Sequence, residues 1–232
     1  MPTLSDSLVT TASFRQSENS GVEIASQSAW IQQVKNVAKN QPVASFSFDR
    51  FEKAIPSILD LSQNEVLISK VPEALSGLGV RFVGLPHLPH TYLDGAAIII
   101  DKNPIVALTF RYDRLDSFWF TLTHELAHIV SGHKGVILDD TEQGTGSANK
   151  DEEDEANQIA SEWLVNQNLL TKYVSDVRPY FSKKSIESFA SQTNRHPAII
   201  LGQLHHKKIV EYKHLRNLLV NVKPYLDSWI YN

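Results

Sequence analysis

The 232-residue sequence contains no cysteine. Without thiols the chain forms no disulfide bond and offers no thiolate ligand, so nitrogen and oxygen atoms alone would hold a bound metal ion. It also contains no apolar run of the roughly 18 residues that a membrane-spanning helix needs. The opening stretch, MPTLSDSLVTTASF, lacks the basic segment and apolar core of a signal peptide. These absences predict a cytoplasmic protein without a membrane segment.

An excess of basic residues is missing as well. The chain has 22 Lys and Arg against 26 Asp and Glu, a formal charge of −4, which gives no electrostatic reason to expect nucleic-acid binding. Residues 185–205, SIESFASQTNRHPAIILGQLH, resemble a helix–turn–helix. The apolar run AIIL, beginning at Ala198, stands where a DNA-reading helix would expose Arg, Lys, Asn or Gln. We therefore expect two packed helices there and no direct nucleic-acid binding.

Hydrophobic residues make up 42% of the chain, enough for a substantial core. Apolar positions at helical spacing predict helices, and shorter runs bounded by turn residues predict strands. The expected helices cover 28–39, 48–61, 63–77, 116–131, 152–168, 184–193 and a stretch after Pro197. The expected strands cover 80–85, 96–100 and 105–110, and the tail 212–231 is predicted to be helical with a break at Pro224.

Three of the nine histidines lie within ten positions, in FTLTHELAHIVSGH at 120–133. On a helix, His124 and His128 lie one turn apart, so their imidazoles can share one tetrahedral cation. Glu125 is rotated about 100° from His124 and can act as a base on an activated water. Both histidines lie roughly opposite the apolar stripe of this helix, whereas histidines that merely pack in a core would lie within it. The pattern indicates a metal site with a built-in base.

A catalytic zinc site takes three protein ligands and keeps one position open. The acidic run at 151–155 offers Glu152, Glu153 and Glu155 as the third ligand. Periodicity alone does not choose among these three. A solvated helix start would explain the same acids, since carboxylates favour the first turn of a helix.

The string THELAHIVSGH, followed after a polar loop by EDEANQIASEWLV, resembles the ImmA/IrrE family of zinc metallopeptidases. This resemblance implies that His124, His128 and Glu155 bind Zn²⁺ and that Glu125 is the general base. Further segments, among them YDRLDSFWF and RHPAIILGQLHH, are similar to the C-terminal, peptidase-like part of HigA-type antidote regulators. In those regulators a helix–turn–helix repressor domain comes first, and only a few polar residues precede the similar part here.

The resemblance implies a zincin-like α+β fold, in which a small mixed or antiparallel sheet packs on the motif helix and helical segments flank it. We divide the chain into a polar segment with a helix (1–45), a zinc metallopeptidase-like domain (46–168) and a C-terminal helical region (169–232).

Two functions follow from these resemblances. The first is a zinc-dependent endopeptidase with a narrow protein substrate, such as a repressor or antitoxin-type regulator. The alternative is a non-catalytic regulatory module of a toxin–antitoxin system that binds a toxin or a repressor. Both functions require a protein partner, either as substrate or as binding partner.

Peptide hydrolysis also needs a group that stabilises the oxyanion. Residue chemistry nominates His133 and Tyr92, although His133 could equally cap its helix and Tyr92 could simply pack in its loop. We expect the strand Ile105–Phe110 to border the cleft and to hold an extended substrate by strand addition. The acidic loop 139–150 is expected to order only when a ligand or partner fills the cleft.

Overall fold

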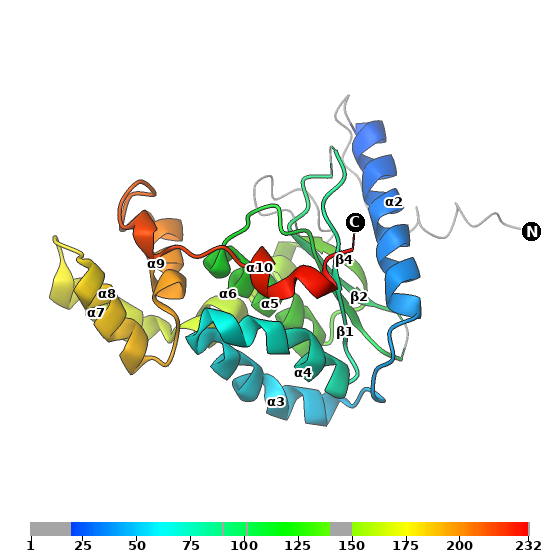
Figure 1. The fold of residues 1–232 in the computed structure, drawn as a ribbon, viewed down its shortest axis with the longest axis horizontal. Helices are drawn as coiled ribbons and strands as arrows, with labels where there is room; N and C mark the ends of the chain where they lie inside the picture. Colours follow the sequence, from blue (N-terminus) through cyan, green and yellow to red (C-terminus); the bar gives the residue numbers. More distant parts are fainter. Residues whose placement is uncertain (1–19, 90, 101, 140–149, 232) are drawn as a thin grey trace, which may run out of the picture.

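A four-stranded mixed sheet lies at the centre of the molecule, in the order β1-β3-β2-β4 (Figure 1). The structure is a computed structural model and describes residues 20–89, 91–100, 102–139 and 150–231. The strands are β1 (Arg81–Gly84), β2 (Gly95–Ile99), β3 (Ile105–Leu108) and β4 (Gly135–Asp139). β1 and β3 run parallel, and β2 pairs antiparallel with both β3 and β4. The predicted α+β fold with a small mixed sheet is confirmed.

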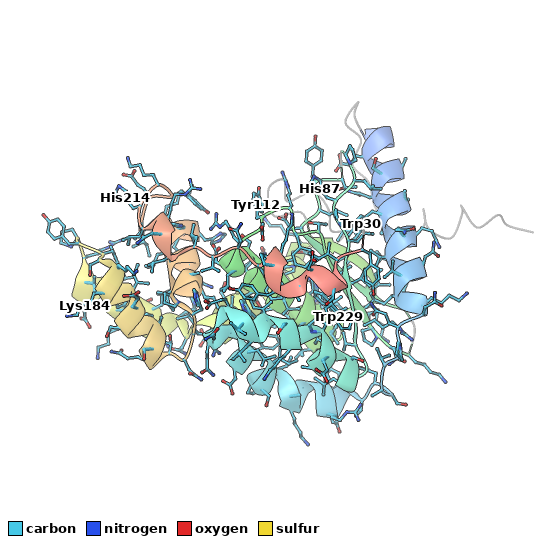
Figure 2. The ribbon with its side chains drawn as sticks, in the orientation of Figure 1. Trp30, His87, Tyr112, Lys184, His214 and Trp229 are labelled. Atoms are coloured by element: carbon cyan, nitrogen blue, oxygen red, sulfur yellow. The ribbon has the colours of Figure 1, made fainter. Side chains whose placement is uncertain are left out.

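Helices cover both faces of this sheet. Because alternate residues of a strand face opposite sides, Phe82 and Val106 join the main core with α5 (Leu115–Val130), which packs on β2 and β3. Val83 and Ala107 face the other way, into a second cluster with α2 (Ser20–Lys39). Trp30, labelled in Figure 2, anchors α2, since its indole nitrogen donates to the Leu85 carbonyl at 3.2 Å.

The remaining helices lie below the sheet and toward the end of the molecule that is far from α2 (Figure 1). They are α3 (Phe48–Asp60), α4 (Val71–Gly77), α6 (Lys150–Leu164), α7 (Gln167–Val177), α8 (Lys183–Gln192), α9 (Pro197–His206) and α10 (Lys223–Leu226). Short 3₁₀ turns cover 61–63, 65–70, 216–218 and 227–229. α6 and α9 both contact α5. Lys184 and His214 mark the end of the molecule formed by α7, α8 and α9 (Figure 2).

Several elements differ from the sequence-based expectation. The helix expected over 28–39 spans Ser20–Lys39. The helix expected over 152–168 ends at Leu164, because Asn166 starts a new helix by accepting from Leu169 N at 3.0 Å. The tail 212–231 forms only short helical turns, and Tyr231 N donates to the Gly84 carbonyl at the edge of β1. Tail residues thus add to the sheet edge instead of forming a regular helix.

The strand expected to border the cleft is internal. β3 pairs with β1 on one side and β2 on the other, so it has no edge to offer an extended substrate. β4, which the sequence pattern did not predict, is an edge strand within the described part of the chain. Residues 140–149 of the acidic loop, and with them its expected ordering by a ligand, lie outside the described residues. Among the helices that are described, none combines the length and apolar character needed to cross a membrane.

Candidate metal centre

Helix α5 carries the histidine motif through the middle of the fold. It buries 13 of its 16 residues, because the sheet, α6 and α9 all pack on it. Arg114, just before the helix, pairs with Asp116 in the first turn, where a carboxylate is favourable. His124 and His128 are completely buried on the side that faces α6. The sequence predicted that both histidines lie opposite the apolar stripe of this helix. In the structure they are nevertheless buried, because α6 packs over them.

Three ligand atoms converge between α5 and α6. The Nε2 atoms of His124 and His128 lie 3.0 Å apart. Glu153 of α6 places one carboxylate oxygen 3.1 Å from His124 Nε2 and the other 3.5 Å from His128 Nε2. All three residues offer a ligand atom within 4.8 Å of the others. They form a group that can hold a metal ion.

The outward-facing nitrogen of each imidazole also has a partner. His124 Nδ1 lies 3.1 Å from the amide oxygen of Asn157, which only accepts, so the proton of His124 is on Nδ1 and its lone pair is on Nε2. His128 Nδ1 lies 2.8 Å from His133 Nδ1. Such outer hydrogen bonds typically orient metal-binding histidines. The lone pair of His124 is thereby aimed at the carboxylate of Glu153.

The charges in this group fit a divalent cation. Burial, together with the neighbouring His124 and His133, lowers the pKa of His128 to about 3, so this imidazole is neutral near pH 7. Glu153 Oε1 is buried and accepts no hydrogen bond from the described residues. A lone pair and a carboxylate that face one another repel unless a proton or a cation lies between them. Two imidazoles and one carboxylate are also a known ligand set for catalytic Zn²⁺.

Glu155, the ligand implied by the family resemblance, points elsewhere. Its carboxylate accepts from Ser131 Oγ at 3.0 Å and lies 3.6 Å from His133 Nε2, and its side chain is 54% exposed. Residues 153 and 155 are rotated about 200° from each other on a helix, so the two carboxylates cannot face the same point. The geometry therefore favours Glu153 over Glu155 as the third ligand.

The predicted base, Glu125, is completely buried beside the start of β2. A Cβ atom at Gly95 would lie 2.5 Å from Glu125 Oε1 and 2.6 Å from Thr121 Cγ2. No side chain fits at this position, so a glycine is required for the carboxylate to lie where it does.

The two residues nominated for the oxyanion lie in different places. His133 contacts His128 through Nδ1, the ring nitrogen of His128 that faces away from the other candidate metal ligands. Tyr92 adopts a positive φ of 52°, and its ring lies under the guanidinium of Arg111 at 5.9 Å. Arg111 also donates to the Tyr92 carbonyl at 3.3 Å. The structure thus brings His133 to the histidine cluster and places Tyr92 beside Arg111.

A comparison with family models now connects this geometry to known proteins. Residues 86–183 match the Peptidase_M78 family, described as the IrrE N-terminal-like domain. This part of the chain is therefore similar to the IrrE N-terminal-like domain. It contains α5 and α6, and therefore every candidate ligand, whereas α9 lies outside the matched residues. No curated protein and no solved structure matches the chain significantly.

Sequence reasoning did not name Asn157 or Gly95, and it left Glu153 open as one of three acids. A signal for Glu153 was present, since it lies one turn before Ala156 and two turns before Ala160, which line the buried face of α6. Asn157 lies one turn after Glu153 on the same face. No local pattern identifies Gly95, because its role depends on contact with a helix that is distant in sequence.

Proposed function

We propose that this protein is a zinc-dependent endopeptidase that cleaves a protein substrate. The observation that carries the proposal is the convergence of His124, His128 and Glu153, two of them on the helix that also carries the buried carboxylate of Glu125. The similarity of residues 86–183 to the IrrE N-terminal-like domain of the Peptidase_M78 family supports a hydrolytic role.

Each residue of the site has a definite task in this proposal. His124, His128 and Glu153 would hold Zn²⁺, which supplies a Lewis acid that polarises a carbonyl and lowers the pKa of a water. Glu125 accepts a proton from the attacking water and delivers it to the leaving amine. Asn157 and His133 keep the two imidazoles oriented, and Tyr92 remains our candidate donor to the oxyanion. Edge strand β4, whose Leu138 borders the neighbouring cavity, can hold an extended peptide by strand addition.

We further propose a narrow substrate, namely a repressor or antitoxin-type regulator in the cytoplasm. The support is the similarity of several segments to HigA-type regulators. Direct reading of DNA is not part of this proposal, because α9, the second helix of the helix–turn–helix-like segment, buries seven of its ten residues.

The substitution Glu125→Gln tests the catalytic claim. Zinc content measured by elemental analysis should equal that of the wild type, because Glu125 is not a ligand. Cleavage of a repressor encoded beside this gene should fall on the order of 10³-fold, the contribution of a general base. The matched control is Glu187→Gln on α8, which should cleave normally, since Glu187 is paired only with Lys183 in the described structure. Binding of the repressor with no cleavage by wild type or variant would instead favour a non-catalytic regulatory module.

A further inference from the structure

A cavity of about 900 Å³ adjoins the candidate metal centre. Residues of α5, α6 and α9 and of the segment 110–114 line it, together with Leu108 and Leu138 of the sheet, and it is open to solvent. A metal ion and a water fill only a small part of this volume. Cavities of roughly 300–1,000 Å³ typically bind organic ligands. The space is therefore large enough for several residues of a peptide.

The cavity is continuous with the metal centre. Glu153 and Asn157 line it and also contact His124. Phe120, half-buried on α5, forms the next part of the wall, and its ring centroid lies 6.4 Å from that of His124. The same ring also stacks on His206 of α9, with 6.1 Å between the ring centroids. A peptide bond positioned at the metal centre would thus place its neighbouring side chain against Phe120.

The wall around Phe120 suits a bulky apolar side chain. Phe110 and Phe118 stack at 6.2 Å with only 9° between their planes, and both line the cavity. The charges of Arg114 and Asp116, also in the wall, are paired with each other. Aromatic surfaces of this kind gain most from burying large apolar or aromatic groups.

Helix α9 completes the wall from outside the matched domain. Ile199, Gln203 and His206 line the cavity, and all three lie beyond residues 86–183. α9 is seated directly on α5, because a Cβ at Gly202 would lie 2.6 Å from Asp116 Cβ. The residues that shape the cavity are thus partly separate from those that form the metal centre.

We propose that this cavity is the subsite that receives an aromatic or long aliphatic side chain of the substrate next to the cleaved peptide bond, with α9 forming its outer wall. This inference rests on the proposed peptidase function and names the class of peptide that the site selects.

A single introduced cysteine tests the proposal, because the natural chain has none. Ser161→Cys places a thiol in the cavity wall on α6, and Ser188→Cys places one on exposed α8 as the control. Both are made in full-length protein carrying Glu125→Gln, so that peptide is not consumed. The probes are N-acetyl-Phe-Phe-amide and N-acetyl-Gly-Gly-amide, and the readout is the rate of thiol modification.

The Phe-Phe peptide should slow modification of residue 161 by about fivefold or more and leave residue 188 unchanged, while the Gly-Gly peptide protects neither. Equal protection by both peptides, or none by either, would overturn the proposal. Because binding is read without turnover, the proposal can survive a chemically inactive protein. Conversely, zinc-dependent cleavage with no apolar preference would refute the subsite and leave the peptidase intact.

Two further variants and one control locate the subsite. Ser117→Phe fills the cavity from α5 and should abolish protection by the Phe-Phe peptide, whereas Ser188→Phe on the exposed face of α8 should not. His206→Ala removes the ring that stacks on Phe120 and should raise the half-protecting peptide concentration roughly two- to tenfold. An unchanged value for His206→Ala would show that α9 takes no part, and circular dichroism confirms that each variant is folded.

Discussion

The histidines of α5 and those around α9 have very different surroundings. His196, at the start of α9, accepts from Ala198 N through Nδ1 at 3.1 Å and lies 3.5 Å from the carboxylate of Glu65 through Nε2. His205 directs Nε2 to the His214 carbonyl at 3.3 Å. In contrast, the Nε2 atoms of His124 and His128 face each other and the carboxylate of Glu153.

This difference separates structural histidines from candidate ligands. Around α9, His196 and His205 each direct a ring nitrogen to a separate partner, although His205 Nδ1 is buried without a hydrogen bond from the described residues. Between α5 and α6, potential ligand atoms from three residues lie close together. Within the described residues, this is the one group of three or more potential ligands close enough to share an ion. Convergence, rather than the number of histidines, identifies the site.

Substitution of one histidine from each region should give the largest difference in zinc affinity. His124→Ala removes one of three ligands and should weaken zinc binding on the order of 10³-fold, about a third of the binding free energy of a typical structural zinc. His196→Ala should keep zinc affinity and lower the free energy of unfolding by about 1 kcal/mol, since it removes a helix cap. Chelator competition measures the first effect and urea unfolding the second. Equal zinc affinities in the two variants would remove the distinction between the regions.

A smaller change beside the base tests how tightly the α5 site is built. Gly95→Ala forces Glu125 to move, and a displacement of about 1 Å can cost roughly 10²-fold in rate. Zinc content should stay the same, because the atoms nearest to a Cβ at Gly95 belong to Glu125, Thr121 and Ala107, none of which is a candidate ligand. Gly77→Ala is the matched control, since a Cβ there meets nothing within 4 Å. Normal cleavage by Gly95→Ala would show that Glu125 tolerates displacement.

Lowering the pH should reduce the stability of the metal-free protein through His128 on α5. Its pKa is lowered to about 3 in the folded protein, so between pH 3 and 6.5 the unfolded chain binds more protons and stability falls as the pH falls. From pH 7 to 5.5 this residue should cost about 1 kcal/mol in the free energy of unfolding. Urea unfolding of chelator-treated wild type and His128→Asn gives the difference. The same pH slope in both proteins would mean that His128 does not carry the effect.

The sequence predicted the parts of this structure that depend on local pattern. The motif helix, its two histidines and the three expected strands came from spacing within about fifteen residues, and the structure has each element within two residues of the expected bounds. Glu153 was among the three acids left open by periodicity. The apolar stripe through Ala156 and Ala160 favours it, whereas the family resemblance pointed to Glu155.

What the sequence did not predict depends on contacts between distant segments. β4 is only five residues long and becomes a strand by pairing with β2. The role of Gly95 depends on α5 packing against β2. The packing of α9 on α5 likewise depends on the close approach of Gly202 to Asp116. The tail follows the edge of β1 instead of its own helical pattern. Our division of the chain at residues 45 and 168 stays a proposal, which limited proteolysis can examine.

The central claim is that Glu153, together with His124 and His128, holds the metal. Zinc dissociation constants of Glu153→Gln and Glu155→Gln, measured side by side by chelator competition, test it most directly. We predict that Glu153→Gln weakens binding by about 10²-fold or more, while Glu155→Gln, which acts only through His133, changes it by less than about tenfold. Wild-type affinity in Glu153→Gln combined with lost binding in Glu155→Gln would contradict the account.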